Sequence, residues 1–596
     1  TIVAEEGGPG FATTASGFEY ERLFGPLLGD RNLLMMDYRG TGGSAAIDCA
    51  PLQTYGGGAG PLSFAAAVAA CGAQLNSTYR NGRGSFVHAS DLFGTSQDVR
   101  DLAAILRALH QGPVDYYGDS YGSFTGQVFA ARYPQMLRTL MLDSTYPTIR
   151  QDPFDRLGQD EIRFGFSAVC ARSLDCSAAA LGSPLSRLAL LAARLDRAPL
   201  TGTTQTPDGT SVGVRIAGPE VWALLRSAGD EPGPYRNMDA AGRAYLYAGD
   251  PAPLLRLYAW TFYGPANVLE SYREFSVGMY IADTCTVYLN PFDIKSSIPQ
   301  RRAQYANAIA ALPASYAYPV PNRDVFASPV ESYDNCITWP APVHNDPIVT
   351  KGPPLVPSTL PVLALSGDLD TESSPGDTRQ AAAALGPSVT FVSLPNEIHI
   401  PVLLDPFNCA SAIVVGFVQH PGTANIACTA RIPEVRTVGV FPLHLSDQPP
   451  ATARPGNIAS TDDLRLAAIA VEALGDALMG AATVYADYGA NCRSGYCGLG
   501  LRGGSFRASS NLSQIELRNV AYSADTVANG GATVSSARFP SDPGYVHAAS
   551  ISARTADGRH RISVDVRYDG RAPRALASIV GTAENGAALR ATVPAP

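Results

Sequence analysis

The sequence predicts an α/β protein with a doubly wound, mostly parallel sheet, an inserted helical cap and a β-rich accessory domain at the carboxyl end. Apolar strand signals alternate with helix signals over residues 1–149 and again over 346–445, a pattern typical of a parallel sheet covered by helices on both faces. Helical segments joined by proline- and tyrosine-rich connections separate the two stretches. Residues 498–596 alternate apolar and polar side chains between glycine- and asparagine-rich turns, as half-exposed strands do.

Residues 1–149 are expected to form the first part of the sheet. Short apolar runs predict its strands, which are 2–4, 32–37, 113–117 and 139–143. A helix is predicted over 96–109, because Val99, Leu102 and Leu106 share one face, and another over 123–133.

The rest of the chain divides where this rhythm changes. The predicted parts are a mostly helical cap over 150–345, a second part of the core over 346–445, a linker with a helical segment over 446–497, and a β-rich domain over 498–596. Within the second core part the predicted strands and helices are 360–366, 376–385, 389–394 and 400–418.

Composition narrows the class of protein. The chain of 596 residues is 46% hydrophobic and 16% charged, which is typical of a globular protein with more than one domain. Its net charge of −9 argues against nucleic acid as the main partner. We find no apolar run that we expect to span a bilayer. Lysine occurs only at Lys295 and Lys351 while alanine is abundant, which is typical of a high-GC bacterial genome.

The ten cysteines fall into close pairs along the chain, which are Cys49/Cys71, Cys170/Cys176, Cys285/Cys336, Cys409/Cys428 and Cys492/Cys497. This even, pairwise spacing predicts five disulfides and an oxidising compartment, hence a secreted or envelope protein. Buried free thiols in a cytosolic enzyme are the alternative. Without a C-x-x-C pair or nearby histidines, no metal site is expected. The start at Thr1, already strand-like, suggests a processed or truncated amino end.

Gly118-Asp119-Ser120-Tyr121-Gly122 is the most informative motif. It follows one predicted strand directly and precedes a predicted helix, so the turn would lift the Ser120 hydroxyl clear of the sheet edge. The flanking glycines suit such a turn, where a side chain would collide with the neighbouring strand or helix. The motif predicts a nucleophile; an ordinary strand–helix turn is the alternative.

A serine nucleophile needs a base and a carboxylate that orients the base. Both are available after later strands, in the order Ser, Asp, His. Asp370 follows the strand at 360–366, and His399 follows the strand at 389–394. Asp370 is preferred to Asp368, which could cap the turn. A solvated loop histidine is the alternative for His399.

An oxyanion hole needs two backbone N–H groups directed at the developing negative charge. Tyr121, directly after the serine, is predicted to supply one. Gly8 is predicted to supply the other, in preference to Gly7, from the early loop Glu6-Gly7-Gly8-Pro9-Gly10.

Taken together, these motifs and Asp37-Tyr38-Arg39-Gly40-Thr41-Gly42-Gly43-Ser44 resemble the α/β-hydrolase peptidases of the proline iminopeptidase and secreted tripeptidyl aminopeptidase type. The resemblance covers residues 1 to about 430. It implies an α/β-hydrolase core, a helical cap, no metal or other cofactor, and cleavage near a peptide's amino terminus. Ser120, Asp370 and His399 match the family's nucleophile, acid and base. Glu6 departs from the histidine common in iminopeptidases, which weakens transfer of proline specificity.

The predicted function is therefore that of a secreted serine exopeptidase acting on peptides. Such an enzyme must bind a free ammonium, and the candidate carboxylates are Glu5, Glu6, Asp283 and Glu331. Each could equally be a structural or solvated acid. The competing functions are an esterase or amidase with the same triad, and a binding protein with a vestigial hydrolase core. The C-terminal domain could contact cell wall or polymer, or only add stability.

Overall fold

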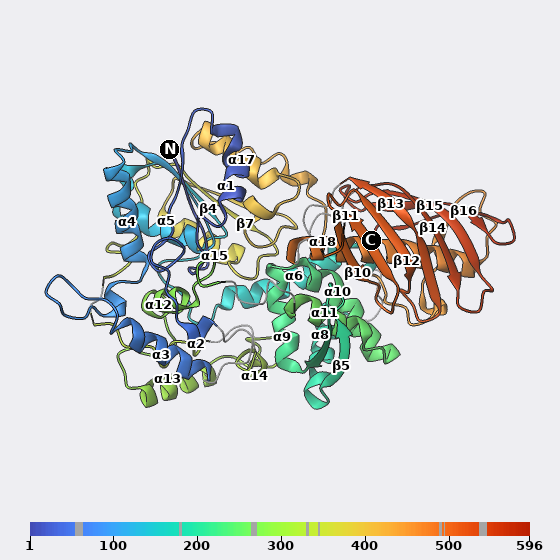
Figure 1. Cartoon of the computed structure of the whole chain (residues 1–596), viewed down its shortest axis with the longest axis horizontal. Coiled ribbons are helices and arrows are strands. Elements are labelled where there is room, and N and C mark those ends of the chain that lie inside the picture. The colour runs from blue at the N-terminus through green and yellow to red at the C-terminus, as the bar shows by residue number, and fades with distance from the viewer. Residues whose placement is uncertain are drawn as a thin grey trace. The chain divides into compact units, whose positions relative to one another are not determined.

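The computed structural model describes residues 1–53, 63–177, 182–263, 271–328, 333–343, 346–487, 491–493, 495–535 and 545–596 (Figure 1). These form two compact units. The first comprises Thr1–Glu161, Val268–Tyr316 and Val330–Thr429; the second comprises Ile162–Asn267, Ala317–Pro329 and Ala430–Pro596. The segment 150–345, predicted as one cap, is thus divided between the two units.

The first unit is built on a parallel sheet with the strand order β2-β1-β3-β4-β7-β8. The strands are β1 (Ile2–Glu5), β2 (Leu33–Met35), β3 (Val114–Asp119), β4 (Leu137–Asp143), β7 (Val362–Gly367) and β8 (Val389–Leu394). The sequence-based expectation of a doubly wound parallel core is confirmed. The strands β1, β3 and β7 are entirely buried, as expected for inner strands of a parallel sheet that helices cover on both faces.

Helices lie on both sides of this sheet. Figure 1 shows α1 (Gly17–Phe24) and α17 (Cys409–Gln419) on one side, with α4 (Thr95–Ala108) and α5 (Tyr121–Arg132) on the other. One hydrophobic core joins α4 and α5 to the sheet and to α15 (Pro375–Leu385). Its members include Leu102, Phe124, Leu140, Val362 and Leu385.

The strand-to-helix turn after β3 is exceptionally tight. A Cβ on Gly118 would lie 2.2 Å from the Gly122 carbonyl oxygen, and a Cβ on Gly122 would lie 2.1 Å from the Glu5 carbonyl oxygen. Between them Ser120 has a φ of 46° and a ψ of −119°. The two glycines therefore let α5 begin directly against β1 while the serine takes the strained conformation.

A second hydrophobic cluster in the first unit is formed by short helices. They are α2 (Ala50–Gln53), α3 (Phe64–Leu75) and α12 (Val277–Val287), and α13 (Ile298–Ala310) follows α12 in the same unit. The disulfides Cys49–Cys71 and Cys285–Cys336 lie within this cluster.

The helix predicted over 400–418 is interrupted. It forms α16 (Pro401–Leu404) and α17, with Asp405 between them. The Asp405 carboxylate accepts hydrogen bonds from the backbone N–H groups of Phe407, Cys409 and Ala410. This capping ends one helix and starts the next, an effect that an apolar periodicity does not reveal.

The second unit contains several helices from the segment predicted as a mostly helical cap, and a hairpin that the sequence analysis did not predict. Its main helices are α8 (Pro184–Arg197), α9 (Gly218–Arg226), α10 (Pro232–Arg243) and α11 (Ala252–Phe262), together with the larger part of α6 (Arg156–Arg172), which begins in the first unit. The hairpin pairs β5 (Leu200–Gln205) with β6 (Ser211–Ile216). Its turn, Thr206-Pro207-Asp208-Gly209-Thr210, closes through the Thr206 N–H to Thr210 carbonyl bond, and Gly209 has a φ of +89°. The Pro-Asp-Gly sequence was the available signal.

The rest of the second unit is an antiparallel sheet packed on one long helix, α18 (Thr461–Asp487). The strand order is β10-β11-β12-β13-β14-β15-β16-β17-β9. The strands are β9 (Thr452–Ala453), β10 (Gly495–Leu499), β11 (Ser505–Ser509), β12 (Gln514–Val520), β13 (Thr526–Ser535), β14 (Tyr545–Thr555), β15 (Arg561–Asp569), β16 (Leu576–Ala583) and β17 (Ala588–Pro594). The β-rich carboxyl end is confirmed, and the segment predicted as a linker contributes the edge strand β9.

Helix α18 is long and apolar enough by composition to cross a membrane, contrary to the expectation that no such run exists. However, 72% of its apolar window is buried. Leu466, Ala470 and Leu474 are fully buried, as are facing-strand residues such as Val566 and Ile579. This burial is that of a core helix under a sheet.

The cysteines form the five pairs that the sequence predicted, which are Cys49–Cys71, Cys170–Cys176, Cys285–Cys336, Cys409–Cys428 and Cys492–Cys497. Each pair lies within one unit. Disulfides of this number are compatible with an extracellular protein.

Because Gly122 approaches β1 closely, adding one methyl group there should strongly destabilise the fold. Gly122→Ala should lower the free energy of unfolding by roughly 3 kcal/mol, because the new Cβ meets backbone that cannot rotate away. Gly112→Ala is the matched control, since a Cβ there meets nothing within 4 Å. Urea unfolding of both variants measures the difference, and equal midpoints would contradict the packing argument.

Candidate active site

Ser120 lies at the top of the tight turn, half-buried, with its backbone held by the adjacent strand. Its N–H donates to the carbonyl oxygen of Asp143, the last residue of β4, at 2.9 Å. Its own carbonyl accepts hydrogen bonds from the Ser123 N–H and hydroxyl. The serine is therefore positioned by backbone contacts, which leaves its side chain available for chemistry.

Asp370 and His399 meet after the ends of β7 and β8. The Asp370 Oδ2 lies 2.9 Å from His399 Nδ1, and Asp370 is fully buried. The Asp370 Oδ1 accepts the N–H groups of Glu372 and Ser373, each at 2.8 Å. These bonds hold the carboxylate in one orientation. A proton on Nδ1 fits this contact, so that Nε2 is the basic nitrogen.

Asp368 is engaged elsewhere. Its Oδ1 accepts the Asn396 N–H at 2.6 Å and thereby joins the loops after β7 and β8. Of the two aspartates in the motif, Asp370 is thus the one whose side chain contacts His399, whereas Asp368 is bound to the neighbouring turn.

Asp143 and Ser144, which the sequence analysis did not single out, connect the serine and histidine loops. While the Asp143 carbonyl holds Ser120, its Oδ2 accepts the Val402 N–H at 3.0 Å. The Ser144 hydroxyl accepts the Ile400 N–H at 2.8 Å. The signal for this pair was its place after the strand that neighbours β3.

Left-handed backbone is concentrated at these contacts. Ser120, Ser144 and Ile400 have φ values of 46°, 52° and 46°. For side chains other than glycine this region is strained by about 1 kcal/mol or more per residue. The hydrogen bonds at the end of β4 offset this strain and hold both loops in their observed conformations.

The glycine loop after β1 packs directly on the nucleophile turn. A Cβ on Gly7 would lie 2.8 Å from the Ser120 Cβ and 3.2 Å from its Oγ. The Gly7 N–H donates to Glu6 Oε1 at 3.2 Å. Gly8 has a φ of +114°, and its N–H has no hydrogen bond within the residues that the structure describes. Tyr121, as the first residue of α5, also has an N–H without an intrahelical acceptor.

The candidate ammonium-binding carboxylates lie mostly in internal networks. Glu5 is fully buried and accepts the Tyr116 hydroxyl at 2.5 Å and the Tyr38 hydroxyl at 3.1 Å. Asp283 is fully buried and accepts the Thr95 hydroxyl at 3.3 Å. These contacts favour structural roles for Glu5 and Asp283. Glu331 lies outside the described residues.

Glu6 forms a hydrogen-bonded group with Tyr20 and Asp119, directly beside the nucleophile turn. The Tyr20 hydroxyl lies 2.8 Å from Glu6 Oε2 and 2.7 Å from Asp119 Oδ2. One hydroxyl proton can serve only one of these contacts, so the other requires a protonated carboxyl. Burial and the nearby Glu6 charge raise the pKa of Asp119 well above its ordinary value. Asp119 therefore holds a proton to higher pH than an exposed aspartate does.

Desolvation dominates the electrostatics beneath the site. Burial raises the pKa of Glu5 to about 7, although hydrogen bonds from Tyr116 and Tyr38 oppose the shift. It likewise raises the pKa of Asp143 to about 7 and that of Asp283 to about 7. Several carboxyls close to the strand ends are thus poised to titrate near neutral pH.

Comparison with known proteins agrees with the architecture. Residues 1–199 match the family model described as alpha/beta hydrolase fold. Among curated proteins, none shows a significant match to the chain. The fold is that of the α/β hydrolases, and hydrolase chemistry is the activity that this family match supports.

Solved structures that resemble the chain include several hydrolases at low identity. A proline iminopeptidase from Mycobacterium smegmatis is 14% identical over 71% of this chain and 89% of its own, with a TM-score of 0.29. A putative non-heme bromoperoxidase, BpoC, from Mycobacterium tuberculosis H37Rv is 14% identical over 71% and 92%, with a TM-score of 0.27. An enol-lactonase from Burkholderia xenovorans LB400 is 13% identical over 70% and 91%, with a TM-score of 0.26.

The raised pKa of Glu5 predicts a pH dependence of stability. With a folded-state pKa of about 7 against an ordinary 4.5, the folded protein keeps a proton that the unfolded chain has released. The contribution of Glu5 to the free energy of unfolding therefore decreases as the pH rises from about 5 to 7, by up to about 1.4 kcal/mol per pH unit. Glu5→Gln should remove that slope from urea unfolding measured across this range.

Glu21→Gln is the control for this experiment, because Glu21 is an exposed carboxylate on α1. It should leave the pH dependence as in the wild type. If Glu5→Gln retained the full wild-type slope, Glu5 would not be the group that titrates.

Proposed function

We propose that the protein is a serine hydrolase that cleaves short peptides from the amino terminus of peptide substrates, with Ser120, His399 and Asp370 as its catalytic residues. The observation that carries the proposal is the 2.9 Å contact between buried Asp370 and His399 Nδ1. It gains force because the Ser120 turn is bound to Asp143, and the segment after His399 is bound to Asp143 and the adjacent Ser144.

The mechanism follows from these groups. Nε2 of His399 takes the Ser120 proton as the hydroxyl oxygen attacks the substrate carbonyl carbon, and the Asp370 carboxylate stabilises the imidazolium that forms. The N–H groups of Gly8 and Tyr121 donate to the oxyanion. His399 then returns the proton to the leaving amine, an acyl-enzyme remains, and water activated by His399 hydrolyses it.

The Gly8 N–H has no hydrogen bond to any residue that the structure describes, which supports its choice over Gly7 for the oxyanion hole. The Gly7 N–H is already bound to Glu6 Oε1. Its lack of a side chain instead permits the close approach of the loop to Ser120. Both glycines are needed in this scheme, for different reasons.

Peptide specificity rests on the motif resemblance described above. An esterase or amidase would use the same three residues on a small acyl substrate, and a binding protein with a vestigial core would use none of them. The ordered Asp370–His399 contact favours an enzyme over the vestigial alternative.

We further propose that the enzyme acts outside the cytoplasm, as a secreted or envelope protein of a bacterium. Five disulfides support this location, because such bonds persist in oxidising compartments. The solvated outer face of the β-rich sheet is available for contact with cell wall or polymer.

Substitution of each of the two aspartates in turn tests the assignment of the triad. Asp370→Asn should lower kcat by about 10⁴-fold, because an amide favours the wrong histidine tautomer. Asp368→Asn keeps an oxygen for the Asn396 N–H and should leave kcat close to the wild-type value. Ser120→Ala should abolish turnover. Steady-state rates on a peptidyl anilide measure all three, and equal losses for the two aspartate variants would exclude the assignment.

Acetylation of the substrate's amino terminus tests exopeptidase action. A charge-assisted hydrogen bond lost with the free ammonium should lower kcat/KM by about 10- to 100-fold. Paired free and acetylated tripeptidyl anilides, with a short acyl ester as a third substrate, give the comparison. Equal rates on both peptides would favour an endopeptidase, and preference for the ester would favour the esterase alternative.

A further inference from the structure

The second unit contains a cavity of about 350 Å³ beside helix α18. Its apolar wall is formed by small and proline side chains, among them Val440, Pro449, Pro450 and Val593. Its polar lining includes Asp175 from α7 (Leu174–Ser177), Glu472 from α18, and Gln448. This volume suits a small organic molecule.

The three polar side chains lack partners within the described part of the chain. Neither the Asp175 nor the Glu472 carboxylate has a side-chain hydrogen bond or ion pair there. Gln448 is only 6% exposed, and its Oε1 is buried without a hydrogen bond. Asp175 and Glu472 are half-buried, and Gln448 is the buried member of the three. An unpaired buried polar group is costly, so this amide beside two unpaired carboxylates points to a ligand.

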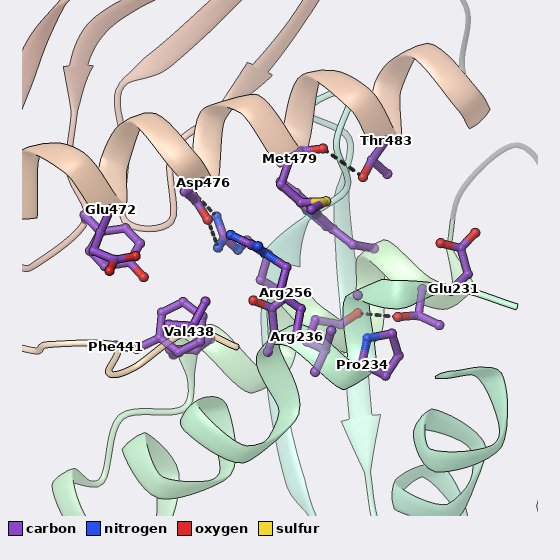
Figure 2. A pocket seen from close by; sticks show the side chains of 17 residues that line it. Glu231, Pro234, Arg236, Arg256, Val438, Phe441, Glu472, Asp476, Met479 and Thr483 are labelled. Carbon is purple, nitrogen blue, oxygen red and sulfur yellow. Dashed lines mark hydrogen bonds and ion pairs between the residues drawn. The ribbon is translucent and has the colours of Figure 1, made fainter. Parts of the chain in front are cut away.

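Figure 2 shows Glu472 from the side of a neighbouring, smaller cavity that it also lines. Dashed lines join Arg256 to Asp476 one turn along α18, whereas none reaches Glu472. The adjacent carboxylate of Asp476 therefore forms an ion pair with a guanidinium, whereas Glu472 forms none with the residues drawn.

Among the residues described, Arg243 carries the only guanidinium that lines the larger cavity, and this group already has hydrogen-bond partners. The Nε of Arg243 donates to Asp239 Oδ2 at 3.0 Å, and its Nη2 donates to the Gly439 carbonyl oxygen at 2.7 Å. The cavity thus presents two carboxylates without an ion pair and one amide, while the guanidinium in its lining is bound to other groups. The charges of Arg236 and Arg436 act on the carboxylates from outside this lining.

Burial raises the pKa of Asp175 to about 6, although the Arg236 and Arg436 charges oppose the shift. Burial also raises the pKa of Glu472 to about 8; the neighbouring Asp175 charge adds to this shift and the Arg236 charge opposes it. The other charged or titratable groups that face the pair are Arg236, Arg243, Arg436, Asp476, Tyr522 and Tyr568. A bound cation would therefore displace a proton.

We propose that this cavity binds a primary ammonium group carried on a short apolar body, with Asp175 and Glu472 accepting its N–H bonds and the proline-rich wall holding the chain. An ammonium supplies three donors to groups that mainly accept. A metal ion fits less well, because the described residues contain no cluster of three or more ligating side chains. The site does not depend on the proposed peptidase function.

The test is calorimetric titration of the full chain with n-butylammonium, 1-butanol and butanoate. Butylammonium should bind saturably, at least tenfold more tightly than either isostere, and at least tenfold more tightly at pH 8 than at pH 6. Both isosteric variants, Glu472→Gln and Asp175→Asn, should weaken binding by about 10- to 100-fold, the effect of one charge-assisted hydrogen bond. Circular dichroism checks that each variant is folded.

Glu516→Gln is the matched control, because Glu516 is an exposed carboxylate of the same unit, on β12, paired with Arg518. It should leave the affinity unchanged. A parallel titration with alaninamide distinguishes a preference for peptide amino termini from one for simple alkylamines. Absence of saturable butylammonium binding, equal binding of 1-butanol, displacement by millimolar calcium, or indifference to both cavity variants would each overturn the proposal.

Discussion

The candidate site depends on one short segment at the end of β4. The carbonyl of Asp143 fixes the Ser120 turn, its carboxylate fixes Val402, and the hydroxyl of Ser144 fixes Ile400. Two loops more than 250 residues apart in the chain thereby share one anchor. Because parallel strands end at the same edge of a sheet, a strand between them is the natural place for such an anchor.

The region below this edge of the sheet contains several buried acids with raised pKa values. Glu5, Asp119 and Asp143 are all fully buried, and burial raises the pKa of each. Tyrosine hydroxyls contact all three. These acids therefore hold their protons to higher pH than exposed carboxylates do, so the stability of the first unit should fall as the pH rises toward neutral.

Prediction from the sequence was most accurate where a local signal was strong. The strands β3, β4, β7 and β8 and the start of α5 are buried or periodic, and their patterns indicated them directly. The interruption near Asp405 and the β5–β6 hairpin were missed. In both cases short polar or turn residues decide the structure, through side-chain to backbone bonds that apolar periodicity does not register.

The sequence by itself determined the order of strands and helices, the pairing of cysteines and the types of residue offered for catalysis. These follow from local apolar periodicity, loop length and motif chemistry. The tertiary structure decided which aspartate contacts His399, that Glu5 and Asp283 lie inside the fold, and that Asp175, Gln448 and Glu472 converge on one cavity. Such contacts join residues remote in the chain, and burial and hydrogen bonding arise only when the elements pack.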